Sequence, residues 1–321
     1  MRARQLIVFG MLLTGFVTSG YSDTFEEALQ LLESKQYDRA EELLRQLNRE
    51  DTKNAEVWYY LGTLQLIKND HDQGIDYLKQ ALKLKEDKRF YEKLGDAYGM
   101  KAQNSGMVKA VFVIPKMREA WEKAIAMDAR DITCRQRLFT YYLVAPGIAG
   151  GDKEKARQLA EEVLSIDPLK GYVLKASFYR YEKKYEEAES QLKAGLAIDS
   201  SDQELLRNLG FLYLEMEKFS DAEKWFRRNR ELYPDEARSY DYLGDYFLKT
   251  DQPDSAFHYF SAAIERDESL LYVHLKKGQA LAKLQKIDEA REAYQLVRSR
   301  STNQFLTKRA DELLKELNAS R

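Results

Sequence analysis

The side chains best suited to catalysis are few and far apart in this sequence. The chain has one cysteine, Cys134, and three histidines at positions 71, 258 and 274. A nucleophilic cysteine needs a base within hydrogen-bond reach, and no histidine stands near Cys134 in the sequence. A single cysteine also excludes an intramolecular disulfide. We therefore interpret Cys134 as a small core residue.

The motifs that would support metal or phosphate chemistry are missing from the sequence. There is no His-Glu-x-x-His pair, no pair of cysteines and no glycine-rich phosphate loop. Gly147 and the pair Gly150-Gly151 do not follow a strand pattern, so they do not make a dinucleotide loop. Acidic pairs such as Glu186-Glu187 stand among basic residues on predicted exposed faces. The sequence thus predicts no catalytic residue, no metal and no cofactor, and it favours a protein that is not an enzyme.

The composition favours a folded helical chain and disfavours a nucleic-acid partner. Charged residues make up 32% and apolar residues 44%, with only five prolines. The chain has 51 Lys and Arg against 53 Asp and Glu, a formal net charge of -2. Nucleic acid is an unfavourable main partner for such a chain, because phosphate binding requires a basic surface.

The first 22 residues have the layout of a signal peptide. Met1 to Arg4 is basic, Leu6 to Val17 is almost wholly apolar, and small residues follow up to Ser22. We predict cleavage near Gly20 or Ser22 and export, most naturally into a bacterial periplasm. The alternative is an uncleaved membrane anchor. The apolar run is shorter than the ~20 residues of a membrane span, so no stable span is expected after cleavage.

The rest of the chain repeats one pattern. A large residue, two variable residues and then Leu-Gly occur at 58–62, 91–95, 206–210 and 240–244. Twelve residues after the glycine comes a small residue, and four further on a bulky one. The unit that begins at Leu206 shows this with Gly210, Ala222 and Phe226. Gly210, Gly244 and Gly278 are each 34 residues apart.

This pattern resembles the tetratricopeptide repeat, a helical hairpin of 34 residues. The resemblance implies an all-α, right-handed solenoid of stacked helix-turn-helix hairpins over residues 23–304. We place about eight repeats, at 21–54, 55–87, 88–131, 132–168, 169–202, 203–236, 237–270 and 271–304. Residues 305–321 read as a capping helix and tail with one apolar stripe. The repeat's small and bulky residues are core positions, where neighbouring hairpins must touch.

Two adjacent units are longer than the repeat. The third holds about ten extra residues and the fourth about five, and we place both insertions in the turn of a hairpin, side by side on one edge. Similar segments occur in a subgroup of exported bacterial tetratricopeptide proteins without defined activity. One interpretation is structured connectors, with Asp152 capping the next helix. The other is a binding edge, which would use Val111, Phe112, Val113, Ile114 and Ile148.

The resemblance also implies a concave groove lined by the first helix of each hairpin. Carrying the family's groove positions over to this chain gives Tyr59, Thr63, Glu92, Asp96, Gln136, Thr140, Arg180, Arg207, Phe211, Asp241, Asp245 and Tyr272. The family's clamp for C-terminal carboxylates needs Lys and Asn at two of these positions. Arg207-Phe211 and Asp241-Asp245 do not match it, so an extended peptide or a partner helix is the expected ligand.

These observations lead to one main hypothesis and two alternatives. The main hypothesis is a non-catalytic scaffold or adaptor in the cell envelope, binding protein or peptide through the groove or the inserted edge. The first alternative is a glycan or small-molecule binder that uses aromatic positions such as Tyr59 and Tyr272. The second is a structural component that self-associates through the apolar run from Val111 to Ile114.

Overall fold

A computed structural model describes residues 21–301 and 303–319 of the chain. Apart from Tyr21 and Ser22, which are helical, the predicted signal peptide lies outside the described residues. Within the described part of the chain the regular structure is helical and contains no strand, so the predicted all-α fold is confirmed. Contacts divide the chain into unit 1, residues 1–159, and unit 2, residues 160–321.

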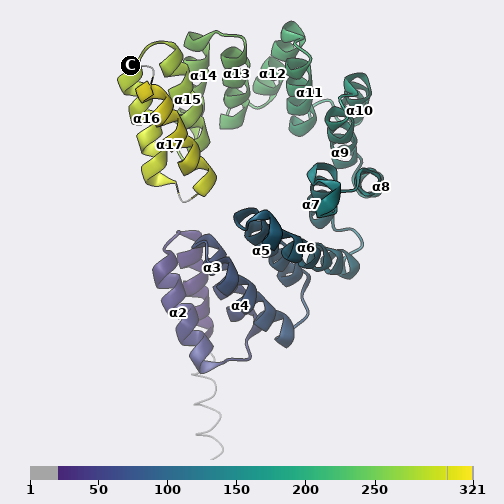
Figure 1. The fold of residues 1–321 in the computed structure, drawn as a ribbon, viewed down its shortest axis with the longest axis vertical. Helices are drawn as coiled ribbons and strands as arrows, with labels where there is room; N and C mark the ends of the chain where they lie inside the picture. The colour runs from purple at the N-terminus through teal and green to yellow at the C-terminus, as the bar shows by residue number, and fades with distance from the viewer. Residues whose placement is uncertain (1–20, 302, 320–321) are drawn as a thin grey trace, which may run out of the picture. The chain divides into compact units, whose positions relative to one another are not determined.

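Unit 1 consists of antiparallel helix pairs that begin with a helical segment at residues 21–33 (Figure 1). Its helices are α2 (Tyr37–Glu50), α3 (Ala55–Ile67), α4 (His71–Leu84), α5 (Lys88–Asn104), α6 (Met107–Met127) and α7 (Thr133–Val144), followed by the 3-10 turn η1 (Gly147–Ala149). The next helix, α8 (Lys153–Ile166), contains the boundary between the two units.

Unit 2 continues with four helix pairs and a final helix (Figure 1). Its helices are α9 (Pro168–Tyr181), α10 (Tyr185–Ile198), α11 (Gln203–Glu215), α12 (Phe219–Leu232), α13 (Ala237–Lys249), α14 (Pro253–Arg266), α15 (Leu271–Lys283), α16 (Ile287–Arg300) and α17 (Gln304–Ala319).

Most hairpins turn on one residue in the left-handed conformation. These residues have φ between 56° and 64° and recur at intervals of 34 within each run: Lys35 and Asn69, then Lys183, Glu217, Asp251 and Gln285. The next amide donates to a carbonyl five residues back, as from Lys218 to Tyr213 at 2.9 Å. This bond satisfies a carbonyl that the end of the helix leaves without a partner.

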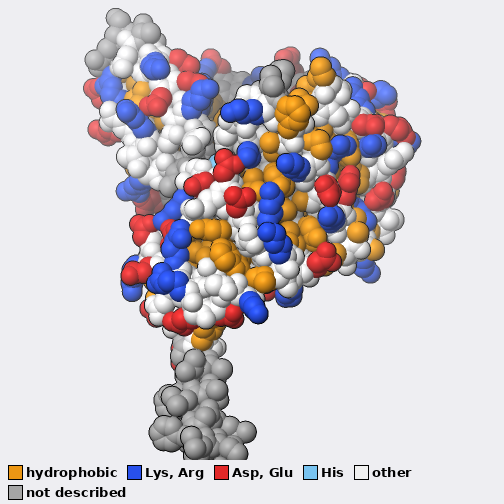
Figure 2. All heavy atoms as spheres, turned by 60° about the horizontal axis from the view of Figure 1, so that its bottom comes forward, with side chains coloured by type: hydrophobic (Ala, Val, Ile, Leu, Met, Phe, Trp, Pro, Cys, Tyr) orange, Lys and Arg blue, Asp and Glu red, His pale blue; other side chains and the backbone are white. Residues whose placement is uncertain are grey.

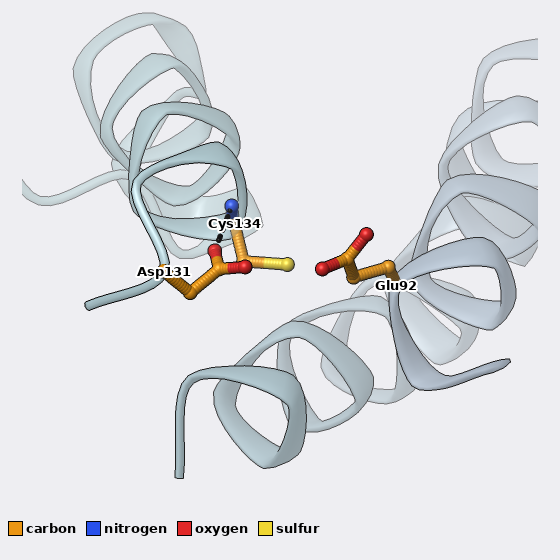
Figure 3. A group of neighbouring side chains, drawn as sticks. All are labelled: Glu92, Asp131 and Cys134. Atoms are coloured by element: carbon orange, nitrogen blue, oxygen red, sulfur yellow. Dashed lines mark hydrogen bonds between the residues drawn. The ribbon is translucent and has the colours of Figure 1, made fainter. Parts of the chain in front are cut away.

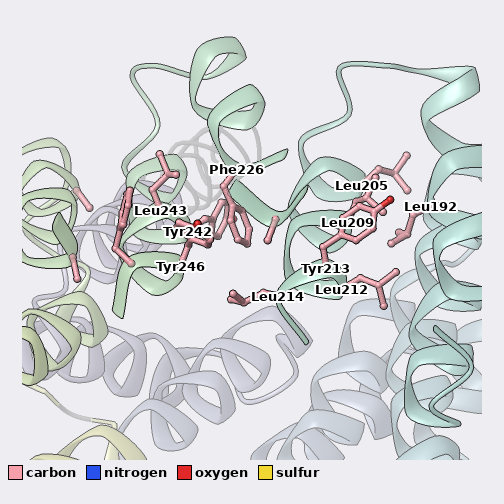
Figure 4. Packing of buried hydrophobic residues seen from close by; sticks show 14 of the residues in the cluster. Leu192, Leu205, Leu209, Leu212, Tyr213, Leu214, Phe226, Tyr242, Leu243 and Tyr246 are labelled. Carbon is pink, nitrogen blue, oxygen red and sulfur yellow. The ribbon is translucent and has the colours of Figure 1, made fainter. Parts of the chain in front are cut away.

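The core of unit 2 depends on glycines that let a bulky ring approach the neighbouring helix. Phe226 is fully buried, and a β-carbon added at Gly210 would lie 2.5 Å from its ring. Phe260 and Tyr294 occupy the same place opposite Gly244 and Gly278. The surrounding leucines and tyrosines fill the space between successive hairpins (Figure 4). These close approaches explain the small-then-bulky spacing of the repeat.

The first insertion lengthens two helices and does not widen their turn, which corrects the expectation from sequence. Gly210, Gly244 and Gly278 each face a ring 16 residues later, whereas Gly95 faces Trp121, 26 residues later. α5 has 17 residues and α6 has 21, against 13 and 14 for α11 and α12. The run from Val111 to Ile114 therefore lies on α6, which packs against α5, and is not an edge without a helical partner.

The second insertion forms a tight, fixed turn after α7. The Tyr141 hydroxyl donates to the carbonyl of Ala149, and Gly150 adopts φ 87°, a conformation that favours glycine. A β-carbon on Gly151 would collide with the carbonyl of Ala145. Asp152 accepts hydrogen bonds from the amides of residues 154 and 155 at 3.1 Å, so its predicted role as a helix cap is confirmed.

The last helix covers the final hairpin. Ala310, Leu313 and Leu317 of α17 are buried and pack in one cluster with Tyr294 and Val297 of α16. The opposite face of α17 carries charged residues such as Lys308 and Glu316. Among the residues that the structure describes, neither α17 nor any other helix combines the length and the apolar character required to cross a bilayer.

Candidate ligand-binding surfaces

Both insertions of unit 1 line a single apolar pocket of about 670 Å³, which we call the insertion pocket. α6 contributes one wall with Ala110, Ile114, Met117 and Trp121, which recur every three or four residues on one face of the helix. α5 adds small residues, including Ala102. The opposite wall comes from α7 and the second insertion, with Tyr141, Val144, Pro146 and Ala149 among its residues.

Among the described residues that line this apolar pocket, one is charged, Arg137. Its Nη2 lies 3.0 Å from Oδ2 of Asp96, and about a third of the arginine side chain is exposed. The Trp121 ring nitrogen donates to the other oxygen of Asp96 at 3.2 Å. Burial raises the pKa of Asp96, and Arg137 opposes that shift. Asp96 therefore holds Arg137 in place through this ion pair, but it is not itself one of the lining residues.

The predicted groove residues Gln136 and Thr140 also line the insertion pocket. The Thr140 hydroxyl donates to the Gln136 carbonyl at 2.9 Å. Of the predicted inserted edge, Val113 is buried and Ile114 lines the pocket. Phe112 is 72% and Ile148 is 91% exposed, and Val111 is also exposed. The predicted edge is thus divided between core, pocket and open surface.

Glu92, another predicted groove residue, belongs to a compact cluster with Asp131 and Cys134 (Figure 3). One ligand atom of each lies within 4.8 Å of the others, which is close enough to be considered for a metal ion. However, the Lys88 ammonium lies 2.6 Å from Asp131 and 3.3 Å from Glu92. It places a cation where a metal would otherwise compensate the carboxylates.

Protonation in this cluster fits a structural ion pair. Burial and the neighbouring Asp131 raise the pKa of Glu92. Burial opposes ionisation of Asp131 as well, but Lys88 and the Cys134 N–H hold its pKa below the ordinary value. The Cys134 N–H donates to Asp131 at 2.6 Å, which caps the start of α7. Asp131 thus joins α7 to Lys88 of α5.

Burial and the two carboxylates raise the pKa of the Cys134 thiol to about 12. We expect the folded protein to react with iodoacetamide at pH 8 on the order of a thousandfold more slowly than a free cysteine, because the thiolate is the reactive form. Mass spectrometry of the alkylated protein measures the rate, and a urea-unfolded sample is the control. Equal rates in the folded and unfolded samples would contradict this placement of Cys134.

In unit 2, three predicted groove residues come together in a second hollow of about 500 Å³, which we call the basic hollow. Arg180 of α9, Arg207 and Phe211 of α11 and Lys249 of α13 all line it. Glu215 is the one acidic residue among the described residues that line it, and it lies 3.3 Å from Arg180. The Phe211 ring is held edge-on against buried Phe226, with 4.9 Å between ring centroids.

The predicted groove residues Asp241, Asp245 and Tyr272 surround Lys276. Its ammonium lies 2.8 Å from Asp241 and 2.7 Å from Asp245. Asp241 is 3% exposed, so it is a core residue and not an open groove position. Burial raises the pKa of both carboxyls, that of Asp245 to about 6, while Lys276 opposes the shift. The Lys276 ammonium also lies 5.1 Å from the centre of the Tyr272 ring.

The remaining predicted positions lie in unit 1. Tyr59 stacks on Phe90 with ring centroids 4.8 Å apart, and Arg89 lies 5.7 Å from the tyrosine ring. The Thr63 hydroxyl donates to the Tyr59 carbonyl at 3.0 Å. On the face of the molecule drawn in Figure 2, basic and acidic side chains are interspersed.

Sequence profiles of the tetratricopeptide repeat match residues 31–95, 179–243 and 243–304, more than half of the chain. The chain belongs to the tetratricopeptide-repeat family. Proteins of this family are generally scaffolds for protein interactions. The insertion pocket, whose lining begins at Gly99 and ends at Ala149, lies between the matched segments. The family's shared pattern therefore does not account for it.

Relatives of this tetratricopeptide-repeat chain have diverse contexts. The type IV pilus assembly protein PilF of Pseudomonas aeruginosa is 25% identical over 150 residues, 46% of this chain and 60% of that protein. The BBSome complex member BBS4 of Bos taurus is 23% identical over 245 residues, 76% of this chain and 44% of that protein. The chain thus spans less than two thirds of either relative.

A solved structure shares the fold over nearly the whole length. It is a tetratricopeptide repeat protein from Parabacteroides merdae, with a TM-score of 0.51 and 14% identity. The match covers 93% of this chain and 99% of that one. At this identity the similarity establishes the tetratricopeptide-repeat fold alone.

Sequence reasoning did not single out several residues that shape these sites. Trp121 and Arg137 were missed in the insertion pocket, and Lys249 was missed in the basic hollow. The signal for Trp121 was available, since it is the bulky residue that follows Gly95 once ten inserted residues are allowed for. Lys276 was also missed, because its two acidic partners stand 35 and 31 residues away in the sequence.

Proposed function

We propose that this protein is a non-catalytic scaffold of the cell envelope that binds a polypeptide partner through the basic hollow. The observation that carries the proposal is the meeting of Arg180, Arg207 and Phe211 in one hollow. All three come from groove positions of the repeat, and they lie on successive first helices of hairpins. Family membership supports the scaffold role, and the signal-peptide layout of residues 1–22 supports the envelope.

The charges of the basic hollow favour an acidic segment. Arg180, Arg207 and Lys249 face one carboxylate, Glu215, in a chain whose overall net charge is -2. Arg207 keeps about a third of its side chain exposed while it contacts Glu204 at 3.2 Å. Phe211 adds an apolar contact between these cations. An extended peptide with acidic and apolar residues would match this arrangement.

The two alternative functions receive less support. A glycan platform needs an open aromatic face, but Tyr59 is covered by Phe90 and Arg89, and Tyr272 lies against Lys276. Self-association through the apolar run has two of its four side chains available, because Val113 is buried and Ile114 lines the pocket. Neither observation favours these alternatives over a polypeptide ligand.

A crosslinking pull-down from the envelope fraction tests the proposal. We expect the double substitution Arg207→Glu and Lys249→Glu to lower recovery of the partner by about tenfold or more, since it reverses the charge of the hollow. The matched control is Lys224→Glu with Lys308→Glu, two exposed lysines outside the hollow that give the same change in net charge. Undiminished recovery with the first pair, or equal loss with both pairs, would contradict a specific basic hollow.

A further inference from the structure

We propose that the insertion pocket binds a small molecule that has an apolar body and a single anionic head group, such as a medium-chain fatty acid. This site is separate from the basic hollow and does not depend on the scaffold proposal. It is formed entirely by residues of unit 1, whereas the hollow is formed entirely by residues of unit 2.

The size and lining of the pocket fit a small apolar ligand. Its volume of about 670 Å³ falls in the range of small-molecule sites. Trp121 and Met117 are buried, and they line the pocket together with the apolar side chains of Ile114 and Val144. Because none of the described residues that line the pocket is a carboxylate, an apolar chain inside it would meet no acidic group among them.

The charge of the residues around the pocket determines which head group the ligand should carry. Among the described residues of the lining Arg137 is the single charged one, and about a third of its side chain is exposed. The segments that contain the lining residues, 99–121 and 133–149, hold six basic residues and one acidic residue, Glu119. Since the whole chain has a net charge of -2, all other residues together carry -7. The local charge therefore favours an anion at this pocket, whereas the net charge of the rest of the chain would repel one.

The pocket is held open by contacts of its own walls. The Tyr141 hydroxyl is engaged by the Ala149 carbonyl, and the Asp152 N–H donates to the Tyr142 carbonyl at 2.9 Å. Asp96 joins Trp121 of one wall to Arg137 of the other. Such fixed walls reduce the ordering cost of binding.

The polar groups of the pocket are too few for a sugar. The hydroxyls of Tyr141 and Thr140 are already donated to backbone carbonyls. What remains beside Arg137 is mainly the amides of Gln103 and Gln136 and the Thr133 hydroxyl. A glycan carries hydroxyls around its whole ring and would leave most of them unpaired against alanine, isoleucine and valine. A fatty acid requires polar contact at one end only.

Fluorescence of 1-anilinonaphthalene-8-sulfonate, which has an apolar body and one sulfonate, tests the site in the full-length protein. We expect saturable binding with one site per chain, displaced best by decanoate, about tenfold less well by decanol, and not by decyltrimethylammonium at equal concentration. Failure of decanoate to displace the probe, or equal displacement by the cationic compound, would overturn the proposal.

Two pairs of variants locate the ligand. Ala110→Phe fills the pocket from α6 and should abolish displaceable binding, whereas Ala126→Phe, at an exposed position of the same helix, should not change it. Thr140→Glu adds a carboxylate at an exposed lining position and should weaken decanoate about tenfold but leave decanol unchanged. Thr140→Gln is its uncharged match. Thermal melts confirm that each variant is folded.

The outcomes separate this site from the scaffold function. The pair Arg207→Glu and Lys249→Glu should leave decanoate binding unchanged, because both residues belong to unit 2. If Ala110→Phe removed the protein partner in the pull-down and wild-type protein bound no decanoate, the pocket would be a docking site for polypeptide and the present proposal would be wrong.

Discussion

Replacing Lys276 by methionine is expected to destabilise the region of α13 and α15 by about 3–5 kcal/mol near pH 7.5. The substitution keeps a long side chain but removes the cation from two carboxylates in a buried setting. Asp241 is 3% exposed, and both carboxylates lie within 2.8 Å of the ammonium. Two uncompensated carboxylates, one buried and one partly exposed, would then repel each other. Hydrogen exchange of peptides from α13 and α15 measures this local loss of stability.

The loss should be larger at pH 7.5 than at pH 5. Burial raises the folded-state pKa of Asp245 to about 6, above its ordinary value of 3.8. A carboxyl that binds its proton more tightly in the folded state stabilises that state at low pH, and this contribution is lost as the pH rises through about 6. Removing Lys276 raises both pKa values further, because the lysine opposes the shift. Acidification should therefore restore part of the variant's stability.

Lys283→Met provides the control on the same helix. Lys283 also forms an ion pair, at 2.6 Å to Asp251, but that aspartate is 80% exposed. An exposed pair contributes only ~0–1 kcal/mol, so this variant should differ little from wild type. Adding Asp245→Asn to Lys276→Met should recover stability by removing one of the two uncompensated charges. The interpretation fails if Lys283→Met is as damaging as Lys276→Met, or if the loss does not depend on pH.

Replacing Phe226 by alanine is expected to cost about 3–5 kcal/mol in the α11–α12 hairpin and to weaken the basic hollow as well. Phe226 is fully buried and lies against Gly210, which has no side chain to fill the space that the ring would leave. The ring also supports Phe211 at 4.9 Å and Tyr242 at 6.2 Å. Partner recovery in the pull-down should therefore fall even where the hairpin remains folded.

Phe219→Ala on the same helix isolates the effect of burial. Phe219 is 38% exposed, so its removal should cost about 1 kcal/mol or less. Hydrogen exchange across α11 and α12 compares the two variants directly. Equal protection in both would show that Phe226 is not the ring on which this hairpin depends.

The sequence by itself determined the all-α repeat fold, because the contacts that define it are local. Gly210 meets Phe226 16 residues away, and the same contact recurs 34 residues later at Gly244 and Phe260. Because these contacts join residues close in the sequence, they appear as a periodic pattern of residue types. For the same reason, the cap at Asp152 could be predicted from its immediate neighbours.

Only the tertiary structure decided what the insertions do and which groove positions are open. Local pattern did not show that residues 99–114 continue two helices, since that depends on Trp121 meeting Gly95 after ten added residues. It also could not show that Asp241 is closed by Lys276, 35 residues away, while Arg207 stays open. Both outcomes depend on the register between packed helices. The position of a side chain in its own repeat fixes its direction, but the neighbouring hairpin decides whether it is covered.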